Sequence, residues 1–153
     1  KSGTPMATTL AKQLAMYVVI YSPLQMAADL LEHYESRPEA FQFVRDVPVD
    51  WEETRALDGA VGEFAVIARR VRGGDDWYLG AVTDDTARTV ALPLDFLEPG
   101  RRYAAQIYRD GEGAGWRTDP HALLIESREV GAGDTLSITM ASGGGQAVRF
   151  IAR

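Results

Sequence analysis

The 153-residue sequence contains no cysteine and only two histidines. A chain without cysteine forms no disulfide framework and no thiolate metal site, and it leaves the redox character of the compartment undetermined. His33 and His121 lie far apart in the sequence and lack the HExxH spacing that places two imidazoles on one metal. We therefore expect no metal site and no cofactor in this chain.

Long apolar runs and an excess of positive charge are also missing. The longest apolar run, residues 14–21, has eight residues, whereas a membrane helix needs roughly 20. Sixteen Lys and Arg against 22 Asp and Glu give a net charge of −6, the wrong sign for a surface that binds phosphate backbones or anionic lipid headgroups. We expect neither nucleic acid nor a membrane as a partner.

What the sequence does have is an ordinary globular composition, with 46% hydrophobic and 25% charged residues. A chain of this length buries enough surface for a real core. The apolar pattern changes at Trp51: before it the apolar residues recur at helical spacing, and after it they alternate. The two parts are therefore expected to differ in structure.

The part before Trp51 reads as helix, strand and helix. Residues 8–21 predict a helix so widely apolar that we expect it to be covered on more than one side. Residues 24–29 predict a short buried strand ending in Asp29, and residues 38–47 predict a second helix with a proline in its first turn. This is half of an α/β repeat, and such a unit does not stand alone.

The part from Trp51 onward predicts only strands. Residues 64–71 and 77–82 indicate a hairpin across a Gly/Asp loop, and apolar residues on both faces of the first run indicate an inner strand. Further strands are expected at residues 89–92, 103–108, 122–130, 135–140 and 147–152. Seven or eight short strands with regular turn signals are typical of an antiparallel β-sandwich.

Carboxylates and glycines supply few candidates for chemistry. Glu52 and Glu53 are adjacent in an extended segment and point to opposite faces, so they cannot be the facing pair that glycoside hydrolysis needs, roughly 5 to 9.5 Å apart. The run 143–145, three glycines, lacks the Lys-Ser/Thr of a phosphate loop and predicts a tight turn. Asp29 is the candidate for the rim of a substrate site, because the carboxyl ends of barrel strands carry the chemistry; helix capping or loop ordering is its alternative role.

Three aromatic residues, Trp77, Tyr103 and Trp116, could form a stacking platform for sugar rings. Aromatics that alternate along the strands of a sandwich also serve as core residues. Burial separates the two interpretations, because exposed coplanar rings favour sugar binding and buried rings favour packing.

Ordered motifs lie along essentially the whole chain. Before Trp51 they are Gly3-Thr4-Pro5-Met6, Gln13-Leu14-Ala15-Met16-Tyr17-Val18-Val19, Ser22-Pro23-Leu24-Gln25-Met26, Ala28-Asp29 and Pro38-Glu39. From Trp51 onward they are Trp51-Glu52-Glu53-Thr54, Leu57-Asp58-Gly59, Val61-Gly62-Glu63-Phe64, Ala68-Arg69-Arg70, Trp77-Tyr78-Leu79-Gly80, Tyr108-Arg109-Asp110-Gly111 and Gly143-Gly144-Gly145. Together these motifs resemble the C-terminal portion of glycoside hydrolase family 97. The opening Lys-Ser-Gly-Thr-Pro also reads as the interior of a longer chain.

The resemblance implies a fold and a domain division. Family members combine an N-terminal β-sandwich, a (β/α)8 barrel and a C-terminal β-sandwich associated with oligomerisation. Residues 1–48 would then be the C-terminal end of the catalytic barrel, with residues 24–29 as its last strand, and residues 49–153 the C-terminal antiparallel β-sandwich. The expected fold class is an α+β fragment, a helix-strand-helix remnant of the barrel followed by the sandwich.

The resemblance also implies a function for the longer protein. Members are bacterial exo-acting α-glucosidases or α-galactosidases, usually calcium-dependent and largely periplasmic, and a periplasmic or extracellular location is expected here. The parent would hydrolyse α-glycosidic bonds by general acid catalysis, with either a base-activated water or a carboxylate nucleophile. The family's catalytic glutamates and calcium ligands lie upstream of every motif matched here, so we expect this chain alone to be inactive.

The expected role of the chain itself is to complete the barrel and support assembly. Its expected partners are the remainder of the barrel, the N-terminal domain and a second copy bound through the sandwich, while α-linked sugars are partners of the parent. The alternative is a stand-alone carbohydrate-binding or protein-interaction β-sandwich module. An independent small enzyme would need a cleft with converging carboxylates, which we do not expect.

Overall fold

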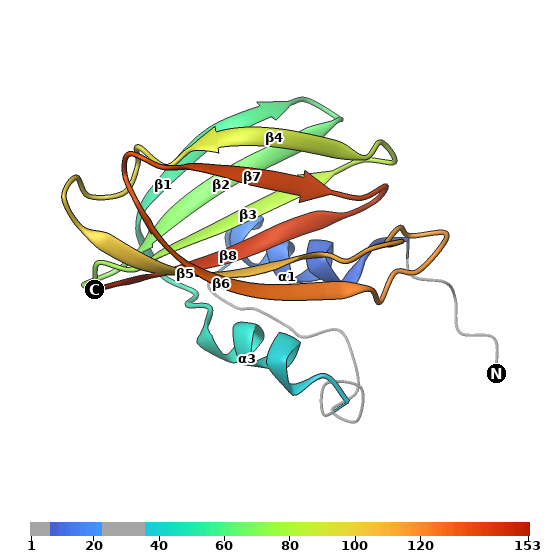
Figure 1. Cartoon of the computed structure of the whole chain (residues 1–153), viewed down its shortest axis with the longest axis horizontal. Coiled ribbons are helices and arrows are strands. Elements are labelled where there is room, and N and C mark those ends of the chain that lie inside the picture. Colours follow the sequence, from blue (N-terminus) through green and yellow to red (C-terminus); the bar gives the residue numbers. More distant parts are fainter. Residues whose placement is uncertain (1–6, 23–35) are drawn as a thin grey trace.

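The computed structural model of the chain describes residues 7–22 and 36–153 (Figure 1). The strand expected at residues 24–29, with Asp29, lies outside the described residues, as does His33. Those expectations stay predictions.

Two helices precede the strands in the described part of the chain. Helix α1, Leu10–Val19, begins after Thr9, whose hydroxyl oxygen accepts a hydrogen bond from the Lys12 amide at 3.2 Å. Helix α3, Pro38–Asp46, has its proline in the first turn and an acidic residue beside it, which suits the positive end of the helix dipole. Both helices lie where the sequence predicts them.

The described residues form eight strands, within the number expected from the sequence. They are β1 Trp51–Ala60, β2 Phe64–Val71, β3 Trp77–Thr83, β4 Arg88–Pro93, β5 Arg102–Asp110, β6 Leu123–Gly131, β7 Thr135–Met140 and β8 Gly145–Ala152. One antiparallel sheet has the order β1-β2-β3-β8-β5-β6, and β4 and β7 form a second, two-stranded sheet. The predicted hairpin is β2–β3, and β2 is an inner strand.

The six-stranded sheet is covered on both faces (Figure 1). Strand β3 shows why, because its side chains alternate: Trp77 and Leu79 belong to the core shared with β4 and β7, and Tyr78 belongs to the core shared with α1 and α3. The fold is therefore a β-sandwich with a helical layer on the outer face of its larger sheet. The helices before Trp51 and the outer face of the larger sheet share one buried core, and the two sheets enclose another.

Candidate functional site: the seat of helix α1

Helix α1 lies against the six-stranded sheet at two glycines, one on β3 and one on β8. A Cβ added to Gly80 would lie 2.5 Å from the carbonyl oxygen of Ala15, and one added to Gly145 would lie 2.7 Å from the Cα of Lys12. On the helix side, Ala11 and Ala15 are fully buried. Small residues on both sides let the helix backbone touch the sheet, and any larger residue at Gly80 would push the helix away.

The C-terminal end of α1 is bound by a buried arginine on β2. The Arg69 side chain donates from Nε to the carbonyl oxygen of Val18 at 2.6 Å and from Nη2 to that of Val19 at 3.2 Å. Its Nη1 donates to the hydroxyl of Thr54 on β1 at 2.8 Å. Burial lowers the pKa of Arg69, yet an arginine stays protonated in proteins, so its charge lies at the negative end of the helix dipole.

The N-terminal end of α1 is bound by two loops of the sandwich. The amide of Thr9 donates to the carbonyl oxygen of Gly143 at 3.1 Å, and the amide of Leu10 donates to that of Pro120 at 2.8 Å. Amides in the first turn of a helix have no acceptor within the helix. The turn between β7 and β8 and the loop between β5 and β6 supply those acceptors, so both ends of α1 are held by the sandwich.

The carboxylate of Asp110 ties the end of β5 to the same β7–β8 turn. Its Oδ2 accepts from the amides of Ala141 at 2.8 Å and Gly145 at 3.0 Å, and a Cβ at Gly144 would collide with it. Asp110 is only 4% exposed. Burial raises the pKa of Asp110, while hydrogen bonding from Thr9 and from the two amides acts in the opposite direction.

Helix α3 is seated on the same face of the sheet through its last residue. The Asp46 carbonyl oxygen accepts from the Tyr78 hydroxyl at 3.0 Å, and its carboxylate pairs with Arg149 at 2.8 Å. The ring of Phe43 meets those of Tyr78 and Tyr108 edge-on, with centroids 5.8 and 5.0 Å apart. Burial is the main cause that raises the pKa of Tyr78 to about 12. Helix α3 is therefore held on the sheet by aromatic contacts, a hydrogen bond and an ion pair.

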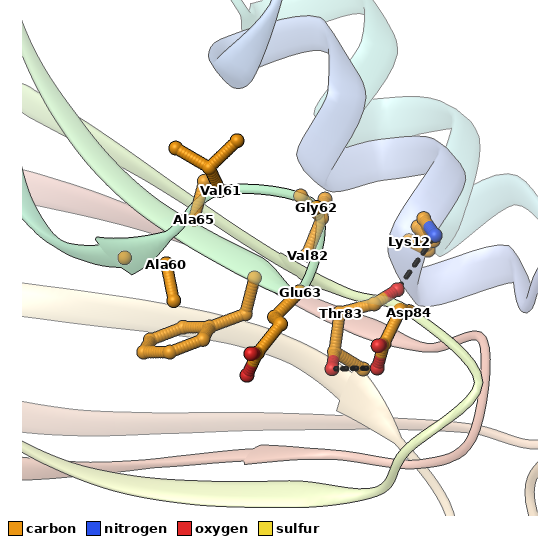
Figure 2. Close-up of a pocket in the computed structure, with 11 residues that line it drawn as sticks. Lys12, Ala60, Val61, Gly62, Glu63, Ala65, Val82, Thr83 and Asp84 are labelled. Atoms are coloured by element: carbon orange, nitrogen blue, oxygen red, sulfur yellow. Dashed lines mark hydrogen bonds between the residues drawn. The ribbon is translucent and has the colours of Figure 1, made fainter.

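A shallow depression of about 540 Å³ lies between α1 and the β1–β2 turn (Figure 2). Lys12 borders it and donates from Nζ to the carbonyl oxygen of Thr83 at 2.7 Å. Its two carboxylates, those of Glu63 and Asp84, both accept from the guanidinium of Arg88, at 3.1 and 3.2 Å. An acid–base pair needs carboxyls free to exchange protons, and these two are engaged by one cation.

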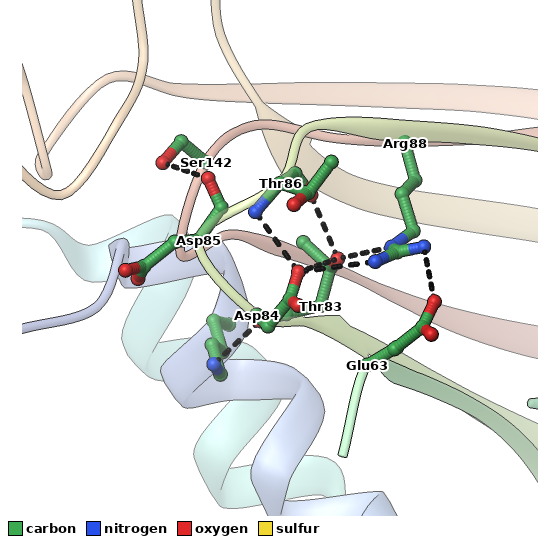
Figure 3. A network of polar contacts seen from close by, with 8 residues as sticks. Glu63, Thr83, Asp84, Asp85, Thr86, Arg88 and Ser142 are labelled. Carbon is green, nitrogen blue, oxygen red and sulfur yellow. Dashed lines mark hydrogen bonds and ion pairs between the residues drawn. The ribbon is translucent and has the colours of Figure 1, made fainter. Parts of the chain in front are cut away.

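The same arginine belongs to a network that joins three connections of the sandwich (Figure 3). Arg88 also donates to the Thr83 hydroxyl at 3.0 Å, and the Ser142 hydroxyl donates to the carbonyl oxygen of Asp85 at 2.6 Å. A hydrogen bond from the Thr86 amide is the main cause that lowers the pKa of Asp84, and the guanidinium of Arg88 lowers it further. The network holds the β1–β2, β3–β4 and β7–β8 connections together.

The structure places the three aromatic candidates in different surroundings. Trp77 and Tyr103 are 3% and 1% exposed and lie in the sandwich core, where the Trp77 ring meets that of Phe96 at 5.1 Å. Trp116 is partly buried in the β5–β6 loop, with the Arg117 guanidinium 4.3 Å from its ring centroid. Two of the three rings therefore present no face to a sugar, and the structure does not bring the three together as a platform.

The other candidates of the sequence serve local contacts. Glu52 and Glu53 pair with arginines, at 3.4 Å from Arg72 and 2.6 Å from Arg55. The run 143–145 forms the β7–β8 turn and the start of β8, as predicted. His121 is exposed, and its carbonyl oxygen accepts from Arg37 at 2.6 Å.

The seat of α1 consists of Gly80 and Gly145, the Arg69 side chain, and the carbonyl groups of Pro120 and Gly143. Sequence reasoning did not single out these residues as contacts of the helix. Gly80 interrupts an apolar strand, which is a signal of close backbone approach. Arg69 stands within the apolar run of β2, where only a specific partner makes a charge tolerable. Both signals were present in the sequence, but neither names the partner.

In residues 7–22 and 36–153, no three His, Cys, Asp or Glu side chains gather where they could hold a metal ion. None of the helices described here is long and apolar enough to cross a membrane.

The architecture defines a class: a small antiparallel β-sandwich with a helical layer on one sheet. Residues 50–151 match the family model described as glycosyl-hydrolase 97 C-terminal, oligomerisation. The chain belongs to this family, which confirms the resemblance seen in the sequence.

Relatives of known identity agree with the family. The chain is 36% identical over 142 residues to a protein named retaining alpha-galactosidase from Bacteroides thetaiotaomicron. The aligned segment covers 93% of this chain and 21% of that protein. It matches a glycoside hydrolase family 97 enzyme from Pseudoalteromonas sp. strain K8, solved with acarbose, at 55% identity and a TM-score of 0.95, over 97% of this chain and 23% of that one. A beta-arabinopyranosidase matches at 27% identity and a TM-score of 0.78, over 97% of this chain and 22% of that one. The chain thus spans about a fifth of the length of its relatives.

Proposed function

We propose that the chain is the C-terminal part of an exo-acting α-glycosidase, an α-galactosidase or α-glucosidase. In that enzyme residues 1–48 complete the catalytic (β/α)8 barrel and residues 49–153 form a sandwich that supports the barrel and takes part in assembly. The catalytic carboxylates and the calcium ligands belong to the upstream barrel, and the enzyme works in the periplasm or outside the cell. Asp29 is proposed at the rim of the sugar site.

The seat of α1 is the observation that carries this proposal. The helix is held at its N-terminal end by two sandwich loops, at its C-terminal end by Arg69, and along its length by Gly80 and Gly145. A helix bound this way has one fixed position relative to the sheet. If α1 is a barrel helix, the sandwich fixes the position of the last part of the barrel, which is a supporting role and not a catalytic one.

The stand-alone sugar-binding module has less support. Its platform needs exposed rings, and Trp77 and Tyr103 are enclosed in the core. The ties between α1 and the sandwich also favour a domain that belongs to a larger structure, since a free binding module needs no such helix.

The test compares this chain with the longer enzyme in hydrolysis of nitrophenyl α-galactoside and nitrophenyl α-glucoside. We expect turnover by the longer enzyme and none by the chain alone, because both carboxylates of the reaction lie elsewhere. Turnover by the isolated chain above that of a heat-inactivated control would overturn the proposal.

The supporting role is tested by Gly80→Val in the longer enzyme. Displacing α1 should lower both the thermal midpoint and kcat, whereas Gly133→Ala, at a turn with open space around it, should change neither. A Gly80→Val enzyme with the wild-type midpoint and kcat would show that the sandwich does not hold the barrel in place.

A further inference from the structure

The described sandwich has four strand edges, and three of them are guarded. The β1 edge of the larger sheet carries two register shifts, between Trp51 and Glu53 and between Ala56 and Asp58. The β6 edge at the other side exposes Glu126 and Arg128. Bulges and charged side chains are the usual devices that stop an edge strand from pairing with another chain.

The β7 edge of the smaller sheet is guarded by a buried glutamine of β8. Gln146 is fully buried, and its Oε1 accepts from the amide of Thr139 at 3.0 Å while its Nε2 donates to the carbonyl oxygen of Ser137 at 3.5 Å. Asp110 accepts from the next outward amide, that of Ala141. These side chains take the place that a neighbouring strand would occupy.

The same contacts show that β4 has a free edge. Thr139 is opposite Thr89, and Ser137 is opposite Ala91. Because the amide of Thr139 and the carbonyl of Ser137 point away from β4, these are the non-hydrogen-bonded pairs of the ladder, and the backbone groups of Thr89 and Ala91 also point outward. Within the described residues, no group outside the β4–β7 ladder bonds to them. Pro93, the next outward position, has no amide to offer.

The outer face beside this edge is uncharged, although a quarter of the chain's residues carry charge. Its exposed side chains are Thr89, Ala91, Pro93, Thr135, Ser137 and Thr139. In a twofold contact each side chain meets the same patch of another copy, so a charge would face a like charge. A neutral outer face is therefore suited to contact with the same face of another copy.

We propose that β4 pairs antiparallel with β4 of a second copy and extends the two-stranded sheet to four strands. The inference rests on the proposed role in assembly, and it names the surface that carries it. Thr89 of one copy lies opposite Ala91 of the other, with Val90 at the twofold axis. This register follows from Pro93, because centring the contact on Ala91 would place the proline, which has no amide, within the ladder.

The experiment measures the mass of the full chain by sedimentation velocity over a range of concentrations. We expect a dimer of twice the 16.7 kDa chain mass. Ala91→Pro removes an amide that no described contact uses, and it should raise the dimer dissociation constant by about tenfold or more. Hydrogen exchange of the Thr89 and Ala91 amides should slow as the wild-type concentration rises.

A second pair of variants distinguishes backbone pairing at the β4 edge from a contact made by the outer face of the β4–β7 sheet. Ala91→Lys places a charge at the proposed twofold contact and should weaken the dimer, less so at high salt. Ser137→Lys makes the same change on the same face one strand away and should leave a dimer. Circular dichroism of each variant verifies that the sandwich is folded.

The possible outcomes separate the inference from the function on which it rests. A wild-type dimer that persists in both Ala91 variants overturns the β4 contact and leaves the role in assembly intact. A chain that stays monomeric in isolation overturns the pairing of two copies, and if the longer enzyme is monomeric as well, the role in assembly falls with it. Slow exchange at Thr89 and Ala91 in a monomeric longer enzyme would assign the edge to a strand of the same molecule.

Discussion

The guanidinium of Arg69 on β2 lies 2.6 Å from the carbonyl oxygen of Val18 in the last turn of α1. Arg69 is 6% exposed, and none of its hydrogen-bond partners among the described residues is a carboxylate. Its charge is instead matched by helix carbonyls and one hydroxyl. Helix α1 and strand β2 are therefore joined by hydrogen bonds from the Arg69 side chain to the backbone at the C-terminal end of the helix.

Removing that cation should loosen α1. Arg69→Met leaves the carbonyl oxygens of Val18 and Val19 and the Thr54 hydroxyl without their donor, which should lower the free energy of unfolding by about 2–3 kcal/mol. The matched control is Arg70→Met, since the neighbouring arginine is 37% exposed and lies 3.8 Å from Glu53, and a pair of that kind contributes less than about 1 kcal/mol. Urea unfolding measures both. Equal losses in the two variants would contradict the role given to Arg69.

Filling the space at Gly80 should displace α1 from β3. Gly80→Ala brings a methyl group to 2.5 Å from the Ala15 carbonyl oxygen, and overpacking of this kind costs about 1–3 kcal/mol. The change should appear as a lower thermal midpoint and as faster amide exchange in α1. Gly133→Ala meets nothing within 4 Å and should stay within about 0.5 kcal/mol of the wild type. An unshifted midpoint in Gly80→Ala would show that the helix is not in contact with the sheet there.

The stability contributed by Asp110 should fall as the pH rises. Burial raises the pKa of Asp110 above its ordinary value of 3.8, so the folded state holds this proton more tightly than the unfolded state. The contribution is then largest below pH 3.8, decreases between 3.8 and the raised pKa, and stays constant above it. Asp110→Asn cannot titrate, and its amide oxygen can still accept from the Ala141 amide.

The measurement is urea unfolding of wild type and Asp110→Asn between pH 3.5 and 7. The free energy of unfolding of the wild type, minus that of the variant, should decrease across the titration. Asp95→Asn, at an exposed position, controls for the loss of one negative charge. A difference that increases with pH would show that hydrogen bonding to the Asp110 carboxylate outweighs its burial.

Sequence patterns were sufficient for most of the fold. The helices at residues 10–19 and 38–46 and the β2–β3 hairpin lie where apolar spacing, proline and glycine place them. The order of the strands was not predictable, because β8 is inserted between β3 and β5 and nothing local in a strand names its neighbour. The aromatic candidates show the same limit: alternation places Trp77 on one face of β3 without saying that the face is closed by β4 and β7.

Apolar periodicity is a local property, and it was sufficient to predict most helices and strands of the described residues. Motifs spread along the chain were sufficient to indicate the family. The contacts of Gly80, Arg69 and Asp110 could be learned from the folded molecule alone, since each residue contacts a segment tens of residues away in the chain. The folded arrangement also shows that β4, alone among the described edges, is left open beside an outer face without charged side chains. The physical reason is that a buried charge, a missing side chain or an unpaired amide has meaning only through the group that lies opposite it, and chain folding alone brings those groups together.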